Sequence, residues 1–238
     1  EHIYVLDPKL RVLQQLDITV GQQYAVVDDN EIIMGADDGI HILYEKPPGL
    51  TELITCNSGS RKSVRGIFVF KDGGVFWGSY GGAGYVDVSG QCHSIEQINS
   101  AYCVLPLSDS ELLVGTEGGF LKVFDRRTLS VRNYDYILSD AVKKKFLYNF
   151  PSSVLSLTQT PHHYLIGSTK GLWAIDKITK VLQPIEIKLD GQLVPNLHIR
   201  HILNLGAEWL VSTPLGLLKV KKEGHAKMLF PAQGSIGI

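Results

Sequence analysis

The stretch YLIGSTKGLWAID at residues 164–176 places a Gly, a Ser, two variable residues and a second Gly between two apolar runs. The same pattern, a small residue followed by Ala, Ser or Thr, two variable residues and Gly, occurs five times along the chain. Its copies begin at Gly35, Gly78, Gly115, Gly167 and Ser212, so successive copies start 37 to 52 residues apart. Repeats of about 40–50 residues are typical of β-propeller blades.

Short apolar runs surround each copy and predict four strands per repeat. For the copy at Gly78 the runs are RGIFVF at 65–70, GVFW at 74–77, YVDV at 85–88 and HSIEQI at 93–98. Four short strands per repeat form one antiparallel blade. We expect the first two strands to be buried between neighbouring blades and the more polar fourth strand to form an exposed outer edge.

The fold class predicted is therefore all-β, a β-propeller built from four-stranded antiparallel blades. We expect five complete blades at about residues 20–54, 64–98, 101–136, 152–188 and 199–230, after a half-blade at residues 1–18. The half-blade predicts that residues 1–238 are either a single propeller domain whose ends share one blade or a fragment of a larger propeller. Residues 231–238 could begin another first strand.

The glycines and hydroxyl residues of the signature have a predicted role in the turn between the second and third strands. The closing Gly is expected to adopt a positive φ, a conformation that Gly adopts freely. The Ser or Thr after the first Gly is expected to bond the turn backbone. The longest spacing, before Gly167, locates an insertion at 135–151 that forms either a short helix or an ordered loop.

Composition excludes several classes of protein. Hydrophobic residues make up 44% and charged residues 20% of the chain, which argues against disorder. The net charge of −1 argues against a nucleic-acid partner. No run approaches the ~18 apolar residues of a membrane span, so we expect no membrane contact by this segment itself. Cys56, Cys92 and Cys103 have no metal-ligand spacing and are expected to be small buried hydrophobes, although one pair could be bridged.

The amino-acid pattern of the repeat resembles the two-component regulator propeller repeat. That repeat reads V-x-S-L, a polar turn, L-W-I-G-T-x-x-G-L, then an aromatic or aliphatic residue and Asp. Residues 152–176 match it in full, residues 112–125 match its second half, and residues 65–82 are a further copy. Ser212 in place of the first Gly, Pro214 in the last turn and Ala36 in the first signature depart from it.

This resemblance implies a function. Such repeats form the periplasmic sensor region of hybrid histidine kinases. The chain would then be an oligosaccharide-sensing, extracytoplasmic part of an inner-membrane protein, homodimeric in the full-length sensor. Kinase activity would lie outside this chain, which would need no cofactor, no metal and no catalytic residue. Two alternatives stay open: a scaffold for protein–protein interaction, and a propeller lyase or hydrolase that uses Asp37, Asp38 and Glu117.

One face of a propeller is the predicted ligand site. Loops leading into the innermost strands and turns between second and third strands lie on the same face. Tyrosines suit sugars, and Arg suits carboxylate or sulfate groups. The candidate ligand-binding residues on this face are Arg61, Lys62, Arg65, Tyr80, Tyr102, Glu117, Lys170, His198 and Arg200. The outer fourth strands and the insertion are the candidate surfaces for a homodimer.

Overall fold

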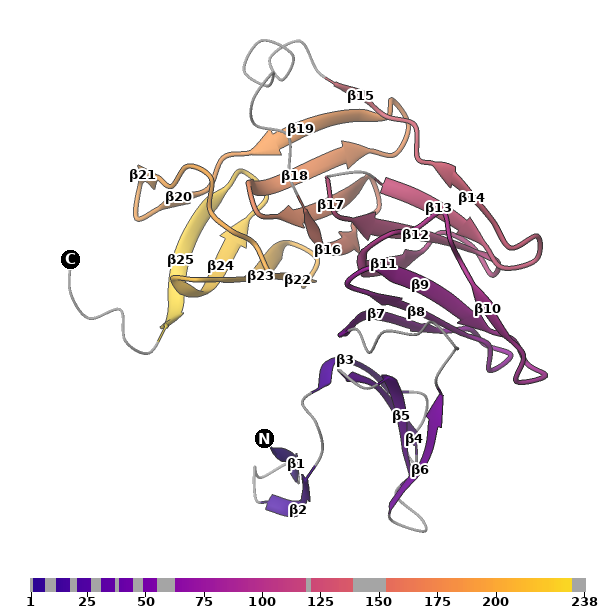
Figure 1. Cartoon of the computed structure of the whole chain (residues 1–238). Coiled ribbons are helices and arrows are strands. Elements are labelled where there is room, and N and C mark those ends of the chain that lie inside the picture. The colour runs from indigo at the N-terminus through magenta and orange to yellow at the C-terminus, as the bar shows by residue number, and fades with distance from the viewer. Residues whose placement is uncertain are drawn as a thin grey trace. The chain divides into compact units, whose positions relative to one another are not determined.

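The computed structural model describes residues 63–118, 121–138 and 153–232 in full, and six earlier strands as backbone together with the buried side chain of Ile33. Every regular element in this part of the chain is a β-strand, and the four main strands of each blade are antiparallel neighbours (Figure 1). The predicted all-β fold of four-stranded antiparallel blades is therefore confirmed. The chain divides into two compact units, Glu1–Tyr102 and Cys103–Ile238.

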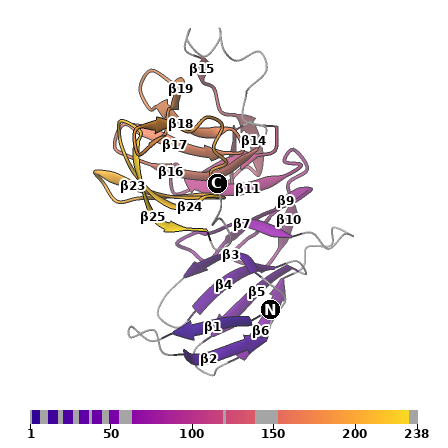
Figure 2. The same cartoon turned by 90° about the vertical axis from the view of Figure 1, so that its left-hand side faces the viewer.

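The first unit contains a two-stranded sheet and two four-stranded sheets. Its strands are β1 (His2–Leu6), β2 (Val12–Asp17), β3 (Gly21–Val26), β4 (Glu31–Ala36), β5 (Gly39–Tyr44), β6 (Gly49–Ile54), β7 (Val64–Val69), β8 (Val75–Ser79), β9 (Gly82–Val86) and β10 (Cys92–Ser94). Each four-stranded sheet follows chain order, as β3 to β6 show in Figure 2. The first strands β3 and β7 of the two sheets pack together, which is the blade-to-blade contact of a propeller.

The second unit holds a four-stranded, a five-stranded and a six-stranded sheet, and the first of them starts just before the unit boundary. Its strands are β11 (Ala101–Pro106), β12 (Glu111–Thr116), β13 (Leu121–Asp125), β14 (Ser130–Asn133), β15 (Ile137–Leu138), β16 (Val154–Gln159), β17 (His163–Ser168), β18 (Gly171–Asp176), β19 (Val181–Ile185), β20 (Lys188–Leu189), β21 (Gln192–Leu193), β22 (His201–Asn204), β23 (Glu208–Thr213), β24 (Gly216–Lys221) and β25 (His225–Pro231). Here too the first strand of one sheet packs on that of the next, β16 against β22.

Two blades have an additional short strand paired with their outer strand, whereas four strands per blade were expected. The short strand β15 pairs in parallel with β19, and β20 pairs in parallel with β25. Backbone bonds hold both, from Ile137 N to Lys180 O at 2.8 Å and from Lys188 N to Gly224 O at 2.9 Å. The outer edges of these two blades are therefore partly covered by the connection that precedes each blade. Of the predicted insertion at 135–151, residues 139–151 lie outside the described residues, as do residues 233–238 of the predicted extra strand.

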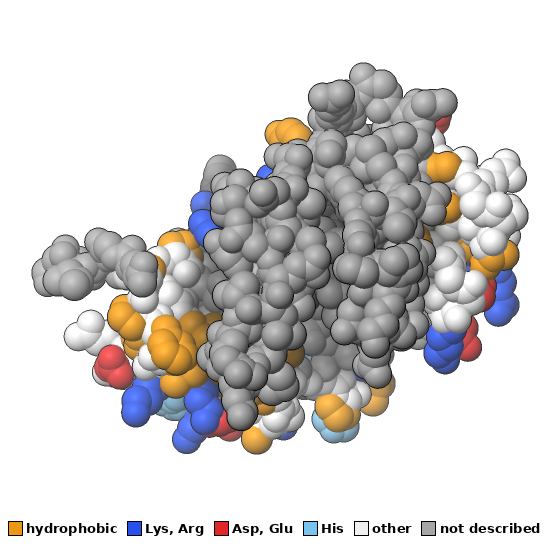
Figure 3. Space-filling view, turned by 90° about the horizontal axis from the view of Figure 1, so that it is seen from below, with side chains coloured by type: hydrophobic (Ala, Val, Ile, Leu, Met, Phe, Trp, Pro, Cys, Tyr) orange, Lys and Arg blue, Asp and Glu red, His pale blue; other side chains and the backbone are white. Residues whose placement is uncertain are grey.

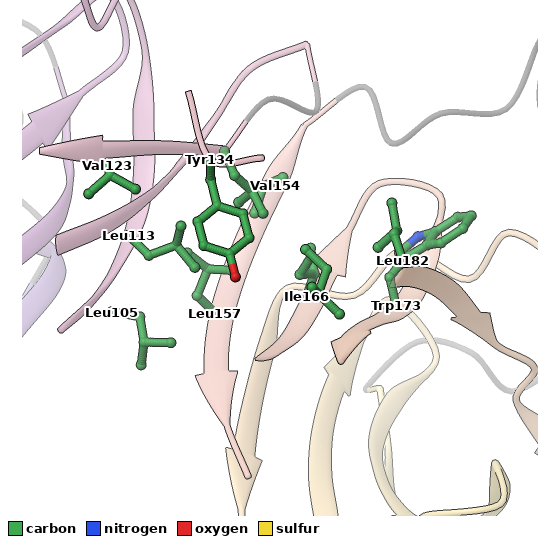
Figure 4. Close-up of a cluster of buried hydrophobic side chains, with 11 residues drawn as sticks. Leu105, Leu113, Val123, Tyr134, Val154, Leu157, Ile166, Trp173 and Leu182 are labelled. Carbon is green, nitrogen blue, oxygen red and sulfur yellow. The ribbon is translucent and has the colours of Figure 1, made fainter. Parts of the chain in front are cut away.

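Buried apolar side chains join adjacent sheets of the second unit. Leu113 comes from β12, while Leu157 and Ile166 come from the next sheet, and all three belong to one buried cluster. Figure 4 shows the ring of Tyr134 lying among Leu113, Val154 and Leu157. Burial of each such side chain contributes roughly 1.5–3 kcal/mol, so this cluster is a main source of cohesion between these blades.

The first Gly of the signature lies where two blades approach most closely. A Cβ at Gly167 would lie 2.7 Å from Ile199 Cγ2, and one at Gly115 would lie 2.5 Å from Val154 Cγ1. A Cβ at Gly78 would overlap the Cβ of Ala101, which is fully buried. No side chain fits at these positions unless the next blade shifts. The repeat therefore needs Gly here for close packing between blades.

The turn chemistry is confirmed in the copies that begin at Gly167 and Ser212. Ser168 Oγ donates to Gly171 O at 2.9 Å and accepts from Lys170 N at 3.1 Å. Thr213 makes the same pair of bonds across its own turn, at 2.9 and 3.1 Å. The closing glycines Gly171 and Gly216 have φ of 116° and 126°, as expected. In the blade of β8 and β9 the expectation is wrong, because Gly81 with φ 104° takes the left-handed conformation in place of Gly82.

We predict that Gly78→Ala destabilises the protein, because the added methyl group has to displace β11. Overpacking of this kind costs ~1–3 kcal/mol. For a chain of this size, each kcal/mol lowers Tm by roughly 2–4 °C, which calorimetry of the purified chain measures.

Gly82→Ala in the same blade is the matched control. Its φ is not positive, and its Cβ would meet only Ser79 Oγ at 3.9 Å. Its effect should stay within ~0.5 kcal/mol. Equal Tm values for the two variants would contradict the close-packing role of Gly78.

Candidate functional site

Three predicted site residues come together in the first unit. Arg65 belongs to β7, Tyr80 to the turn after β8, and Tyr102 to the start of β11. The Cζ atom of Arg65 lies 5.4 Å from the centroid of the Tyr102 ring. The rings of Tyr80 and Tyr102 have centroids 6.4 Å apart and planes tilted by 31°. We call these three residues the Arg–Tyr cluster.

Local backbone geometry brings the Arg–Tyr cluster together. The register of β7 and β8 shifts between Val64 and Gly66, which makes Arg65 the extra residue of a β-bulge. Bulges redirect side chains and are frequent beside binding sites. The backbone N–H of Tyr80 donates to Ser63 O at 3.2 Å, so the turn is fixed to the start of the same strand.

The Arg–Tyr cluster combines a buried and an exposed aromatic ring. Tyr102 is 7% exposed and supports the guanidinium from below the surface, whereas Tyr80 is 55% exposed. Two polar atoms of this strand segment, Ser63 Oγ and Arg65 Nε, are buried and have no hydrogen-bond partner in the described part of the chain. An exposed ring next to free donors can hold a ligand that has both an apolar face and acceptor oxygens.

Ser63 was not among the predicted site residues. A single serine in a loop carries no periodic signal, and it is notable only because its hydroxyl is buried and unbonded two residues before Arg65. Arg61 and Lys62, which were predicted for the same loop, lie outside the described residues.

The second unit places Lys170 in a cavity. Lys170 and Asn196 lie at its polar parts, and Trp173, Leu193 and Pro195 are among its apolar walls. The cavity has a volume of about 280 Å³ and lies between the β17–β18 turn and the loop that leads towards β22. Both segments were predicted for the ligand face, and here they share one hollow.

His198 and Arg200 follow this loop but do not line the cavity. Burial lowers the pKa of His198, and the positive charge of Arg200 lowers it further. The pKa of His201 is lowered by the same two causes in the same order. The imidazoles therefore favour their neutral form, which leaves Arg200 as the cationic group of this loop. Glu117, the remaining predicted residue, is exposed and forms a β-bridge with Ser153.

Carboxylate–histidine pairs in the described residues stabilise turns between strands. Asp87 lies 2.9 Å from His93, and Asp176 lies 3.8 Å from His163. The His93 bond is the largest cause of the lowered pKa of Asp87, and the Thr179 backbone N–H is the largest cause for Asp176. Both carboxylates also accept backbone N–H bonds from the turn that follows, as in Ser89 N to Asp87 at 2.9 Å. These pairs fix the turns between third and fourth strands.

Within the described ranges, no group of three or more His, Cys, Asp or Glu side chains is arranged to hold a metal ion. The same ranges contain no helix with the length and apolar character to cross a bilayer. In the face shown in Figure 3, described basic and acidic side chains lie beside one another at both sides of the view.

Comparison with known proteins gives similar folds at low identity. No family model and no curated protein matches the chain. The extracellular domain of a putative hybrid two-component system from B. thetaiotaomicron is 17% identical with TM-score 0.66, over 85% of this chain. A catalytically inactive virginiamycin B lyase from Staphylococcus aureus is 11% identical with TM-score 0.73, over 98% of this chain.

A third similar structure is PorZ, a surface component of the type-IX secretion system of Porphyromonas gingivalis. It is 13% identical with TM-score 0.66, over 90% of this chain. The chain spans 26% of the two-component extracellular domain, 34% of the PorZ chain and 78% of the lyase chain. At these identities the likeness shows the propeller fold.

We predict that Arg200→Gln raises the pKa of His198. Removing the neighbouring charge removes one of the two causes of depression, while burial remains. NMR titration of the imidazole protons measures the change, and His201 should move in the same direction. As control, Arg132→Gln removes an arginine that pairs with Glu111 at 3.1 Å and should leave His198 unchanged. A His198 midpoint that stays the same in Arg200→Gln would exclude the electrostatic coupling.

Proposed function

We propose that the chain is an extracytoplasmic, ligand-sensing module of a hybrid two-component sensor, and that its ligand is an oligosaccharide. The Arg–Tyr cluster carries this proposal, because it joins an exposed ring to free donors on the predicted ligand face. The wording of the repeat and the folds of two-component extracellular domains support it. Kinase activity would belong to another part of the sensor.

The chemistry of the Arg–Tyr cluster suits a sugar. One face of a pyranose carries C–H groups that stack on an aromatic ring, and its edges carry hydroxyls. Tyr80 offers a largely exposed ring for the first, and Ser63 and Arg65 offer hydrogen-bonding groups for the second. The buried Tyr102 holds the guanidinium in place, so little side-chain freedom is lost on binding.

The cysteines support an extracytoplasmic location. Cys92 is disulfide-bonded, and Cys103 is free. Disulfides persist in oxidising compartments such as the periplasm and are rare in the cytosol of mesophiles. Cys103 donates to Val154 O at 3.5 Å, and burial raises the pKa of its thiol, so it is a poor nucleophile.

The thiol chemistry gives a direct test of location. The chain has three cysteines, so Cys56 is the partner available to Cys92 within it. We predict that chain exported to an oxidising compartment shows one thiol on unfolding without reductant and all three after reduction. Peptide mapping should join Cys92 to Cys56, and a thiol reagent should leave native Cys103 unmodified. Three free thiols in the exported protein would count against a native location in an oxidising compartment.

A homodimer in the full-length sensor is part of the proposal. Among the described sheets, β10 and β14 end theirs as outer strands, and such edges can pair with a second chain. Analytical ultracentrifugation of the complete sensor, with and without ligand, tests this, and a strict monomer under both conditions would exclude it.

A lyase is the second candidate function, since a virginiamycin B lyase shares the fold at TM-score 0.73. That structure contains quinupristin, which makes quinupristin the natural test compound. Of the predicted catalytic carboxylates, Asp37 and Asp38 lie outside the described residues, and Glu117 forms a backbone bridge at a strand start. Loss of quinupristin in the presence of the chain, followed by chromatography, would favour this candidate over sensing.

We predict that the chain binds members of an oligosaccharide panel in calorimetry and that Tyr80→Ala weakens binding about tenfold. A stacked ring is worth roughly 0.5–1.5 kcal/mol beyond its buried area, and about 1.4 kcal/mol corresponds to tenfold. Tyr80→Phe is the matched control because it keeps the ring. Absence of heat across a broad panel, with unaltered folding, would remove the sensing function.

A further inference from the structure

Arg65 has no carboxylate partner among the described residues, unlike Arg132 and Lys219. Arg132 pairs with Glu111 at 3.1 Å, and Lys219 pairs with Glu208 at 2.6 Å. Within the described residues, Arg65 makes no ion pair, and its recorded contact is with the ring of Tyr102. No described carboxylate therefore neutralises the charge of this guanidinium.

The unbonded nitrogen of Arg65 indicates which kind of ligand could bind there. Nε is buried and unbonded, and Ser63 Oγ, two residues earlier in the chain, is buried and unbonded too. Buried polar atoms without partners are rare, and a bound ligand, an ion or water is one way in which such atoms are satisfied. Nε and one terminal nitrogen form the edge of the guanidinium fork that binds a carboxylate or sulfate through two parallel bonds.

The position of Arg65 in its blade fits a binding role. Arg65 directly precedes Gly66, which pairs with the first Gly of the signature, Gly78. At the same place in the blade of β16, Leu155 precedes Ser156, which pairs with Gly167. An apolar residue is therefore compatible with this bulge, and the fold does not require an arginine there. The charge at Arg65 is available for recognition.

We infer that the Arg–Tyr cluster is an anion subsite and that the saccharide recognised there is acidic, with its carboxylate or sulfate ester bound by Arg65. This inference rests on the proposed sensing function. The acid group takes the Nε edge of the guanidinium and the Ser63 hydroxyl, while the sugar ring lies on the exposed face of Tyr80. Tyr102 fixes the guanidinium plane from the protein side.

The test measures calorimetric binding of paired ligands to the whole chain. One pair is an oligogalacturonate and its carboxyl-reduced, neutral counterpart. The second pair is a sulfated oligosaccharide and its desulfated counterpart. We expect the acidic member of at least one pair to bind about 10–100-fold more tightly than its neutral partner, as charge-assisted bonds allow. Raising salt from ~0.05 to ~0.5 M should narrow that difference.

Three variants complete the test. Arg65→Gln should remove the preference for the acidic member, and Arg65→Lys, which keeps the charge but loses the fork, should retain only part of it. Arg132→Gln, an exposed arginine paired with Glu111, is the matched control and should change nothing. If Arg65→Gln fails to fold by circular dichroism, Arg65→Lys and Ser63→Ala carry the comparison.

The outcomes separate the two proposals. Neutral and acidic partners that bind equally, or acidic ligands that bind Arg65→Gln and Arg65→Lys as tightly as the parent, overturn the anion subsite and leave the sensing function standing. Absence of binding by every ligand in the panel overturns both the anion subsite and the sensing function. Which pair shows the preference distinguishes a carboxylate from a sulfate ester.

Discussion

The rest of the structure depends on the close approach of each blade's first strand to the second strand of the blade before it. A Cβ on Gly78 would overlap Ala101 in β11, and a Cβ on Gly167 would lie 2.7 Å from Ile199 Cγ2, two residues before β22. This approach brings the apolar faces of successive sheets within packing distance, and clusters such as that around Leu113 then exclude water. It also fixes the level at which each blade presents its turns and strand starts.

Because every blade holds its turns and strand starts at the same backbone position, a repetitive scaffold can still carry a binding site in one blade alone. In each blade, one residue of the first strand pairs with the first residue of the signature. The residue just before it is Arg65 in one blade, Leu155 in another and Arg200 in a third. Tyr102 stands as far before Gly115 as Arg65 stands before Gly78. The backbone repeats while the side chain varies, so binding chemistry can change at this position without disturbing the packing of the blades.

The sequence was sufficient for the parts of the structure that repeat. The apolar runs and the signature located the four main strands of each sheet, because each strand must bury the same face. They could not reveal β15, β20 and β21, since strands of two residues leave no periodic pattern. For the site, repeat position alone brought Arg65, Tyr80 and Tyr102 onto the candidate face. The roles of Ser63 Oγ and the free Nε depend on burial, which no spacing encodes.

The parallel strands β15 and β20 have a consequence for how the fold can diversify. Each belongs to a connection between blades, and each is fastened to the outer strand of the blade that follows. Such a fastening closes to other chains a row of backbone groups that would otherwise invite intermolecular pairing and aggregation. Because the fastening occupies only Ile137 and Leu138 on one connection, residues can be added after it while the edge stays protected. Chain length can thus vary between blades at little risk to solubility.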